Sequence, residues 1–120
     1  MTRLTEGRLA HTFNTGWIAT KYDNWSFYQN HFKDSCAGNK AVDFVALESS
    51  SKTLWLIELK DYRQHRRQKS IALHEEIAMK VRDSLAGLFA AARYRSDHTE
   101  KDVAKACLSA KLIRIVLHLE

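Results

Sequence analysis

Two short apolar runs with a polar connection between them lie in the middle of the chain. Residues 41–47 read Ala-Val-Asp-Phe-Val-Ala-Leu, residues 54–60 read Leu-Trp-Leu-Ile-Glu-Leu-Lys, and residues 48–53 are polar. Apolar runs of this length are typical of buried strands, and the short connection predicts a β-hairpin. With a symmetric turn, residues at equal distances from its centre face each other: Leu47 and Leu54, Val45 and Leu56, and Asp43 and Glu58.

The C-terminal part of the chain changes to a helical period. Apolar side chains recur there at steps of three and four residues, at Ile77, Val81, Leu85, Leu88 and Ala92. This spacing predicts a long helix over residues 70–95. Thr99 precedes two acidic residues, so we expect it to cap a second helix that ends near Ala110. The β-branched stretch 111–120 predicts a final strand.

The N-terminal part is less regular. We predict a short helix over residues 3–14, in which Leu4, Leu9 and Phe13 are the apolar anchors. The aromatic stretch 25–32 favours a strand, and residues 33–40 have the composition of a loop.

The predicted order is therefore helix, three strands, helix, helix and strand, which indicates an α/β domain with a small mixed central sheet flanked by helices. A length of 120 residues favours one domain over 1–120, and an end inside the last strand leaves a C-terminal truncation open. No apolar run approaches the roughly 18 residues of a membrane span. Cys36 and Cys107 have no metal-binding spacing. We expect a soluble, cytoplasmic protein.

Positive charge is concentrated just after the second apolar run. The chain carries 19 Lys and Arg against 14 Asp and Glu, a net charge of +5. Residues 60–69 hold a large part of this excess, with Asp61 as their one acid against Lys60, Arg63, Arg66, Arg67 and Lys69. Such a cluster favours an anionic partner such as nucleic acid, whereas a solvated basic loop is the alternative.

Polar residues interrupt the two apolar strands. Asp43 is expected to face Glu58, and strand alternation places Glu58 and Lys60 on one side of the sheet. Two facing carboxylates repel each other among apolar neighbours, so a partner must offset their charge. Hard oxygen ligands favour Mg²⁺ or Mn²⁺. The alternative is a structural ion pair of Lys60 with Asp43 or Glu58.

Asp43, followed after fourteen residues by Glu58-Leu59-Lys60, resembles the motif of the PD-(D/E)xK nuclease superfamily, also called restriction-endonuclease-like. The proline of that motif is absent, because Val42 precedes Asp43. The predicted element order is also similar to the αβββαβ core of the superfamily, over about residues 5–119.

The resemblance implies a role for each matching residue. Asp43 and Glu58 would bind the metal ion together with the Leu59 carbonyl group, and Lys60 would assist the attacking water. Glu6, the acid expected on the first helix, would complete the metal site. From the long helix Lys80 would contribute a polar side chain.

The function expected from these residues is Mg²⁺-dependent hydrolysis of phosphodiester bonds, in DNA rather than RNA, by an endonuclease or exonuclease. Arg63, Arg66, Arg67 and Lys69 would bind backbone phosphates next to the cut site. A homodimer or further domains of a longer protein would supply target choice. Two alternatives remain open: a catalytically inactive nucleic-acid-binding module that uses the basic 60–69 segment, and a protein-interaction domain.

Overall fold

The central hairpin predicted from the sequence forms the middle of a mixed four-stranded sheet. The computed structural model describes residues 1–94 and 97–120. Its sheet has the order β3 (Trp17–Lys21), β4 (Phe44–Glu48), β5 (Thr53–Lys60) and β6 (Leu112–Leu119). The first three strands are antiparallel and β6 runs parallel to β5. The predicted facing pairs Val45–Leu56 and Leu47–Leu54 are confirmed.

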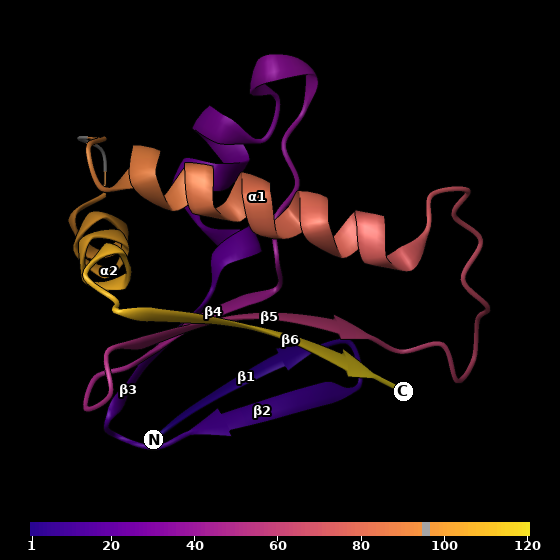
Figure 1. Cartoon of the computed structure of the whole chain (residues 1–120), viewed down its shortest axis with the longest axis horizontal. Coiled ribbons are helices and arrows are strands. Elements are labelled where there is room, and N and C mark those ends of the chain that lie inside the picture. The colour runs from indigo at the N-terminus through magenta and orange to yellow at the C-terminus, as the bar shows by residue number, and fades with distance from the viewer. Residues whose placement is uncertain (95–96) are drawn as a thin grey trace.

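Different layers cover the two faces of this sheet. Helices α1 (Leu73–Ala91) and α2 (His98–Leu108) lie over one face, and the β1–β2 hairpin (Thr2–Glu6 and Leu9–Phe13) lies over the other (Figure 1). Strand alternation divides the core accordingly. Val45 and Leu56 belong to the apolar cluster on the helix side, whereas Phe44 and Ile57 belong to the cluster on the hairpin side. An α/β domain with a mixed sheet and two main helices is thus confirmed.

The N-terminal helix predicted over residues 3–14 is wrong. The chain forms strands β1 and β2 there, joined by Gly7 and Arg8. Gly7 has φ +58°, a left-handed conformation that glycine adopts without strain and that a two-residue hairpin turn requires. Leu9 and Phe13 are buried as expected, but they lie on one face of a strand and not of a helix.

The strand predicted over residues 25–32 is also wrong. The chain turns there through short helical segments: η1 (Tyr22–Asn24), the π-helical η2 (Tyr28–Phe32) and η3 (Ser35–Ala37). Tyr22, Trp25 and Tyr28 are buried among one another and against α1, so the aromatic run fills the core on the helix side. The expected αβββαβ order therefore fails at its first and second elements, and a restriction-endonuclease-like core is not confirmed.

The C-terminal elements agree with the prediction except at their ends. Asp97, and not Thr99, caps α2, because the Asp97 carboxylate accepts a hydrogen bond from the Glu100 amide at 3.0 Å. Helix α1 ends at Ala91, and the predicted end at residue 95 lies outside the described residues. Strand β6 is an edge strand whose Ile113, Ile115 and Leu119 are exposed. Among the described residues, no helix combines the length and apolarity that crossing a membrane requires.

Candidate functional site

Four of the predicted site residues meet between the sheet and α1. Asp43 immediately precedes β4, Glu58 and Lys60 lie in β5, and Lys80 lies in α1. Residues 58 and 60 share a face with Leu54 and Leu56, which is the face that α1 covers. The side chains of Glu58, Lys60 and Lys80 thus lie together, with Asp43 beside Glu58.

Asp43 and Glu58 are buried side by side and are linked through the backbone. The Asp43 amide donates to Glu58 Oε1 at 3.2 Å, and Asp43 Oδ2 accepts from the Leu59 amide at 2.8 Å. Burial, together with the negative charge of Glu58, raises the pKa of Asp43 to about 7. Near neutral pH this carboxyl group is therefore partly protonated.

Lysines of the sheet and of the helix offset the charge of Glu58. Lys80 donates to Glu58 Oε2, and Lys60 Nζ lies 3.4 Å from the same oxygen. The Glu58–Lys60 ion pair, an alternative that the sequence left open, is thus present. Burial alone would lower the pKa of Lys60, but the hydrogen bond to Glu76 and the charge of Glu58 outweigh it and raise the pKa.

Glu76 of α1 is the residue of this network that sequence reasoning left out of the site. It is fully buried and accepts from three cations: Lys60 at 2.7 Å, Arg67 at 2.8 Å and Lys69 at 2.6 Å. Burial opposes ionisation, but these three hydrogen bonds outweigh it and hold the pKa of Glu76 well below its usual range. The spacing of Glu76 and Lys80, four residues apart on a helix, is the signal that could have indicated it.

A second group of carboxylates lies beside Asp43. Carboxylate oxygens of Glu6, Asp23 and Asp43 all lie within 4.8 Å of one another. Oδ1 of Asp23 is buried and has no hydrogen-bond partner within the described residues. Burial, followed by the charge of Glu6, raises the pKa of Asp23 to about 6. Such a set of hard oxygen donors fits Mg²⁺ or Mn²⁺.

This set differs from the predicted metal ligands. Glu6 and Asp43 belong to it, but Asp23 was not predicted, and Glu58 instead faces Lys60 and Lys80. Glu6 lies on β1 and not on a helix, and it also pairs with Lys21 at 3.0 Å. Asp23 was missed because it follows β3, a strand that the sequence did not predict.

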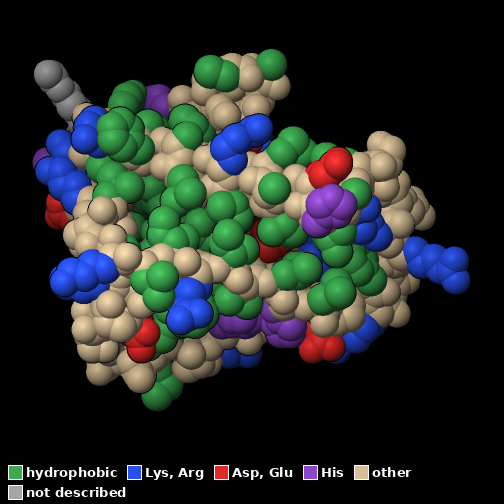
Figure 2. Space-filling model, in the orientation of Figure 1, with side chains coloured by type: hydrophobic (Ala, Val, Ile, Leu, Met, Phe, Trp, Pro, Cys, Tyr) green, Lys and Arg blue, Asp and Glu red, His purple; other side chains and the backbone are tan. Residues whose placement is uncertain are grey.

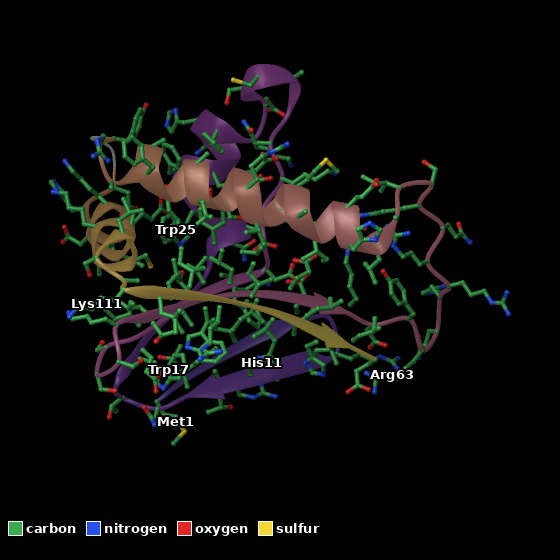
Figure 3. All side chains as sticks on the ribbon, viewed as in Figure 1. Met1, His11, Trp17, Trp25, Arg63 and Lys111 are labelled. Atoms are coloured by element: carbon green, nitrogen blue, oxygen red, sulfur yellow. The ribbon has the colours of Figure 1, made fainter. Side chains whose placement is uncertain are left out.

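The basic 60–69 segment leaves the end of β5 and runs along the edge of the molecule to α1 (Figure 1). Arg63 makes two hydrogen bonds to Asp61, at 2.7 and 2.8 Å, which lower the pKa of that carboxyl to about 2. Arg66 is exposed and takes part in none of the ion pairs of the described residues. Figure 3 shows Arg63 at the opposite end of the molecule from Lys111.

The β1–β2 turn extends this basic region. A hollow of about 180 Å³ lies between the turn and the segment, lined by Gly7, Arg8, Asp61, Gln64 and His65. The 60–69 segment carries five cations, Lys60, Arg63, Arg66, Arg67 and Lys69, against the one acid Asp61, and Arg8 of the β1–β2 turn adds a sixth cation. The excess of positive charge makes this end of the molecule a suitable surface for a polyanion.

Comparison with known proteins finds similarity to part of a tRNA ligase. The chain is similar to the cysteine–tRNA ligase of Neisseria meningitidis serogroup A, with 36% identity over 151 aligned positions. This similarity covers the whole chain but 21% of the ligase, so the chain spans about a fifth of its relative's length. No family model matches the chain, and no solved structure matches it.

This comparison contradicts the nuclease interpretation. The relative is named a ligase. The predicted assignment to the PD-(D/E)xK superfamily is therefore wrong. The predicted hydrolysis of phosphodiester bonds by an endonuclease or exonuclease is wrong for the same reason. Asp43 and Glu58-Leu59-Lys60 are present and adjacent, but their spacing alone did not identify the family. The comparison also gives no support to DNA as the partner or to a homodimer.

Proposed function

We propose that this chain is a nucleic-acid-binding module whose ligand is tRNA. The observation that carries the proposal is the basic 60–69 segment at the end of β5, where cations outnumber acids and Arg66 is exposed with no ion-pair partner among the described residues. The name of the similar ligase supports tRNA as the ligand. Catalysis of aminoacylation is not part of the proposal, because the similarity covers a fifth of that ligase.

The basic segment suits contacts to backbone phosphates. Its side chains leave an exposed stretch between β5 and α1, and the Arg63 and Lys69 side chains are 51% and 52% exposed. An arriving phosphate would replace Asp61 at Arg63, since both present two oxygens to the guanidinium group. Arg67 and Lys60 form ion pairs with the buried Glu76, and their positive charge would still attract a phosphate bound at the exposed segment.

Mg²⁺ or Mn²⁺ belongs to the same proposal. Three carboxylates in one group would repel a phosphate backbone, and a divalent cation held by Glu6, Asp23 and Asp43 would offset two of their three negative charges. Asp23 Oδ1, which has no hydrogen-bond partner in the described part of the chain, would become a ligand of this cation. The cation would act here as a counter-ion between the protein and RNA.

A binding measurement with a charge-reversed variant tests the proposal. Fluorescence anisotropy of end-labelled tRNA would be recorded against the full 120-residue chain in about 0.1 M salt, where surface electrostatics remain measurable. The double variant Arg63→Glu/Arg66→Glu reverses two exposed cations of the segment. We expect its affinity for tRNA to fall roughly tenfold or more, because phosphate contacts dominate such binding.

The matched control is Lys33→Glu/Lys40→Glu, which changes the net charge equally in the exposed 33–40 loop. The control should bind tRNA nearly as well as the unmodified chain. A duplex DNA of similar length, used as competitor, distinguishes tRNA from nucleic acid in general. Equal affinity in both double variants would contradict the role of the basic segment, and no binding to tRNA would reject the proposal.

A further inference from the structure

A second basic cavity lies at the other end of α1. It has a volume of about 570 Å³ and opens between the C-terminal end of α1 and the face of α2, lined by Ala92, Arg93, Lys101, Lys105, Leu108 and Ser109. This volume lies within the range of small-molecule sites in proteins. Figure 2 shows Lys and Arg side chains gathered over this end of the molecule, at the left of the view.

The cations of this cavity are not neutralised within the described part of the chain. Arg93, Lys101 and Lys105 all line it, no carboxylate lines it, and none of the ion pairs involves these three residues. Lys101 and Lys105 are four residues apart, so they project from one side of α2. Three cations converging on one cavity fit a phosphate group.

The acids near the start of α2 are used elsewhere. The Glu100 carboxylate accepts from the amides of Ser26 and Phe27 at 2.8 and 2.9 Å, on the side of α2 that faces the 25–32 segment. The Asp97 carboxylate accepts from the Glu100 amide and caps the helix. No ion pair therefore joins Asp97, Glu100 or the neighbouring Asp102 to Lys101 or Lys105 in the described part of the chain.

Apolar and aromatic groups adjoin the cations. Ala92 and Leu108 line the cavity, and the Arg93 guanidinium carbon lies 3.7 Å from the ring centre of Phe89, whose side chain is exposed. The Phe89 ring attracts the Arg93 guanidinium group from one side, and the Arg93 side chain is exposed and thus accessible to a second flat group. A phosphate beside a flat, weakly polar ring is the chemistry of a nucleotide.

We propose that this α1–α2 cavity binds a nucleotide, with its phosphate on Lys101 and Lys105 and its base against Arg93 and Leu108. The nucleotide is either a free mononucleotide or a residue of an RNA strand. This site is separate from the basic 60–69 segment, because the two lie at opposite ends of α1, roughly 28 Å apart along its 19 residues (Figure 1). Binding of a nucleotide within an RNA strand rests on the proposed tRNA binding, whereas binding of a free mononucleotide does not.

The test compares Lys101→Glu/Lys105→Glu with the Lys33→Glu/Lys40→Glu control. Adenosine monophosphate, adenosine and inorganic phosphate are titrated into each protein, and the amide shifts of Ala92, Leu108 and Ser109 are followed by NMR. Labelled tRNA is titrated in parallel by anisotropy. Circular dichroism of both variants confirms that α2 is folded.

Two results would support the cavity as a nucleotide site. The first is that adenosine monophosphate shifts these three amides, binds at least tenfold more tightly than adenosine, and binds tenfold more weakly to the α2 variant. This result identifies a free nucleotide as the ligand. A loss of about tenfold in tRNA affinity in the α2 variant alone identifies a nucleotide of RNA.

Unchanged binding of all four probes in the α2 variant, or shifts caused equally by inorganic phosphate alone, would overturn the inference. Because Arg63→Glu/Arg66→Glu tests the basic segment separately, failure of the proposed tRNA binding leaves the mononucleotide result interpretable. Conversely, intact tRNA binding, with no effect of the α2 substitutions on any of the four probes, would reject this cavity and keep the proposed function.

Discussion

Glu58 accepts a hydrogen bond from the Asp43 amide at 3.2 Å, although Asp43 lies just outside the β4–β5 ladder. Asp43 in turn accepts from the amide of Leu59, so the two buried carboxylates lock the start of β4 to the end of β5. Lys80 and Lys60 compensate Glu58, but no cation pairs with Asp43 among the described residues. The charge of Asp43 therefore depends on pH near neutrality, because its pKa is raised to about 7.

Asp43 makes the stability of the chain depend on pH between about 4 and 7. Its pKa is raised from 3.8 to about 7 in the folded state, so in this range the folded chain holds a proton that the unfolded chain releases. Stability from this group is complete below pH 4 and is lost as the pH rises through 7. We expect Asp43→Asn to gain stability relative to the unmodified chain between pH 4 and 8.

Urea unfolding at several pH values, followed by tryptophan fluorescence, measures this difference. Asp34→Asn, in the exposed 33–40 loop, serves as the control. A stability difference between Asp43→Asn and the unmodified chain that is constant over the range, or that grows in the opposite direction, would show that Asp43 is ionised throughout.

Glu76 should be important for stability at neutral pH. Glu76→Gln keeps the shape of this fully buried side chain but removes the charge that pairs with Lys60, Arg67 and Lys69. Removing one partner of a buried ion pair typically costs about 3–5 kcal/mol of stability. Because one of these partners is half exposed, we expect the free energy of unfolding to fall by about 3 kcal/mol at pH 7, the lower end of that range.

The pH dependence of the Glu76 effect has the opposite sign to that of Asp43. Because the pKa of Glu76 is lowered in the folded state, its contribution is complete above its ordinary value of 4.5 and decreases as the pH falls below it. Chemical denaturation at pH 7 and at pH 3 tests both points. Glu75→Gln, an exposed neighbour, should change stability by less than about 0.5 kcal/mol. A loss in Glu76→Gln no larger than this would contradict the network.

Gly87 allows Tyr22 to pack against α1. A β-carbon at position 87 would overlap the Tyr22 hydroxyl and lie 3.1 Å from its ring carbon Cζ. Helix propensity alone would make Gly87→Ala stabilising by up to about 1 kcal/mol. Overpacking outweighs this gain, so we expect a net loss of roughly 1–3 kcal/mol. Combining Gly87→Ala with Tyr22→Phe should recover part of the loss in denaturation experiments, whereas additive effects would contradict the contact.

Mg²⁺ should stabilise the folded chain through Glu6, Asp23 and Asp43. At pH 8, and at a Mg²⁺ concentration several times its Kd, the expected gain is about 1 kcal/mol, or roughly 4 °C in Tm. The gain should shrink below pH 6, where protons compete at Asp23 and Asp43. Differential scanning fluorimetry measures it. An equal rise of Tm in Asp23→Asn would exclude this group of carboxylates as the binding site.

The central hairpin, both long helices and the final strand could be predicted because each has one clear hydrophobic period. The register of the β4–β5 hairpin could also be predicted, because two apolar runs joined by a short polar turn allow few ways of pairing residues 41–47 with residues 54–60. Between residues 2 and 13 the pattern was ambiguous: Leu9 and Phe13, four residues apart, satisfy a helix as well as a strand. The aromatic stretch 25–32 has strand propensity, but the packing of Trp25 and Tyr28 in the core overrides it.

The part of the candidate site that strand alternation and hairpin register determine could be predicted from the sequence. These place Asp43, Glu58 and Lys60 together, since all three lie on or beside one hairpin. Glu76 and Asp23 join the site through tertiary packing, which residue spacing does not show. The same limit applies to the family: the Asp43 and Glu58-Leu59-Lys60 spacing fits a buried ion-pair network as well as a nuclease, and the comparison with a cysteine–tRNA ligase contradicts the nuclease.

The salt dependence of tRNA binding tests the proposed function most directly. Each phosphate contact releases counterions, so the logarithm of the binding constant should fall linearly with the logarithm of salt concentration. For the unmodified chain we expect this slope to be about −3, which corresponds to three to four phosphate contacts. For Arg63→Glu/Arg66→Glu we expect the magnitude of the slope to be smaller by about two. A slope near zero for the unmodified chain, or the same slope in both proteins, would contradict tRNA binding through the basic segment.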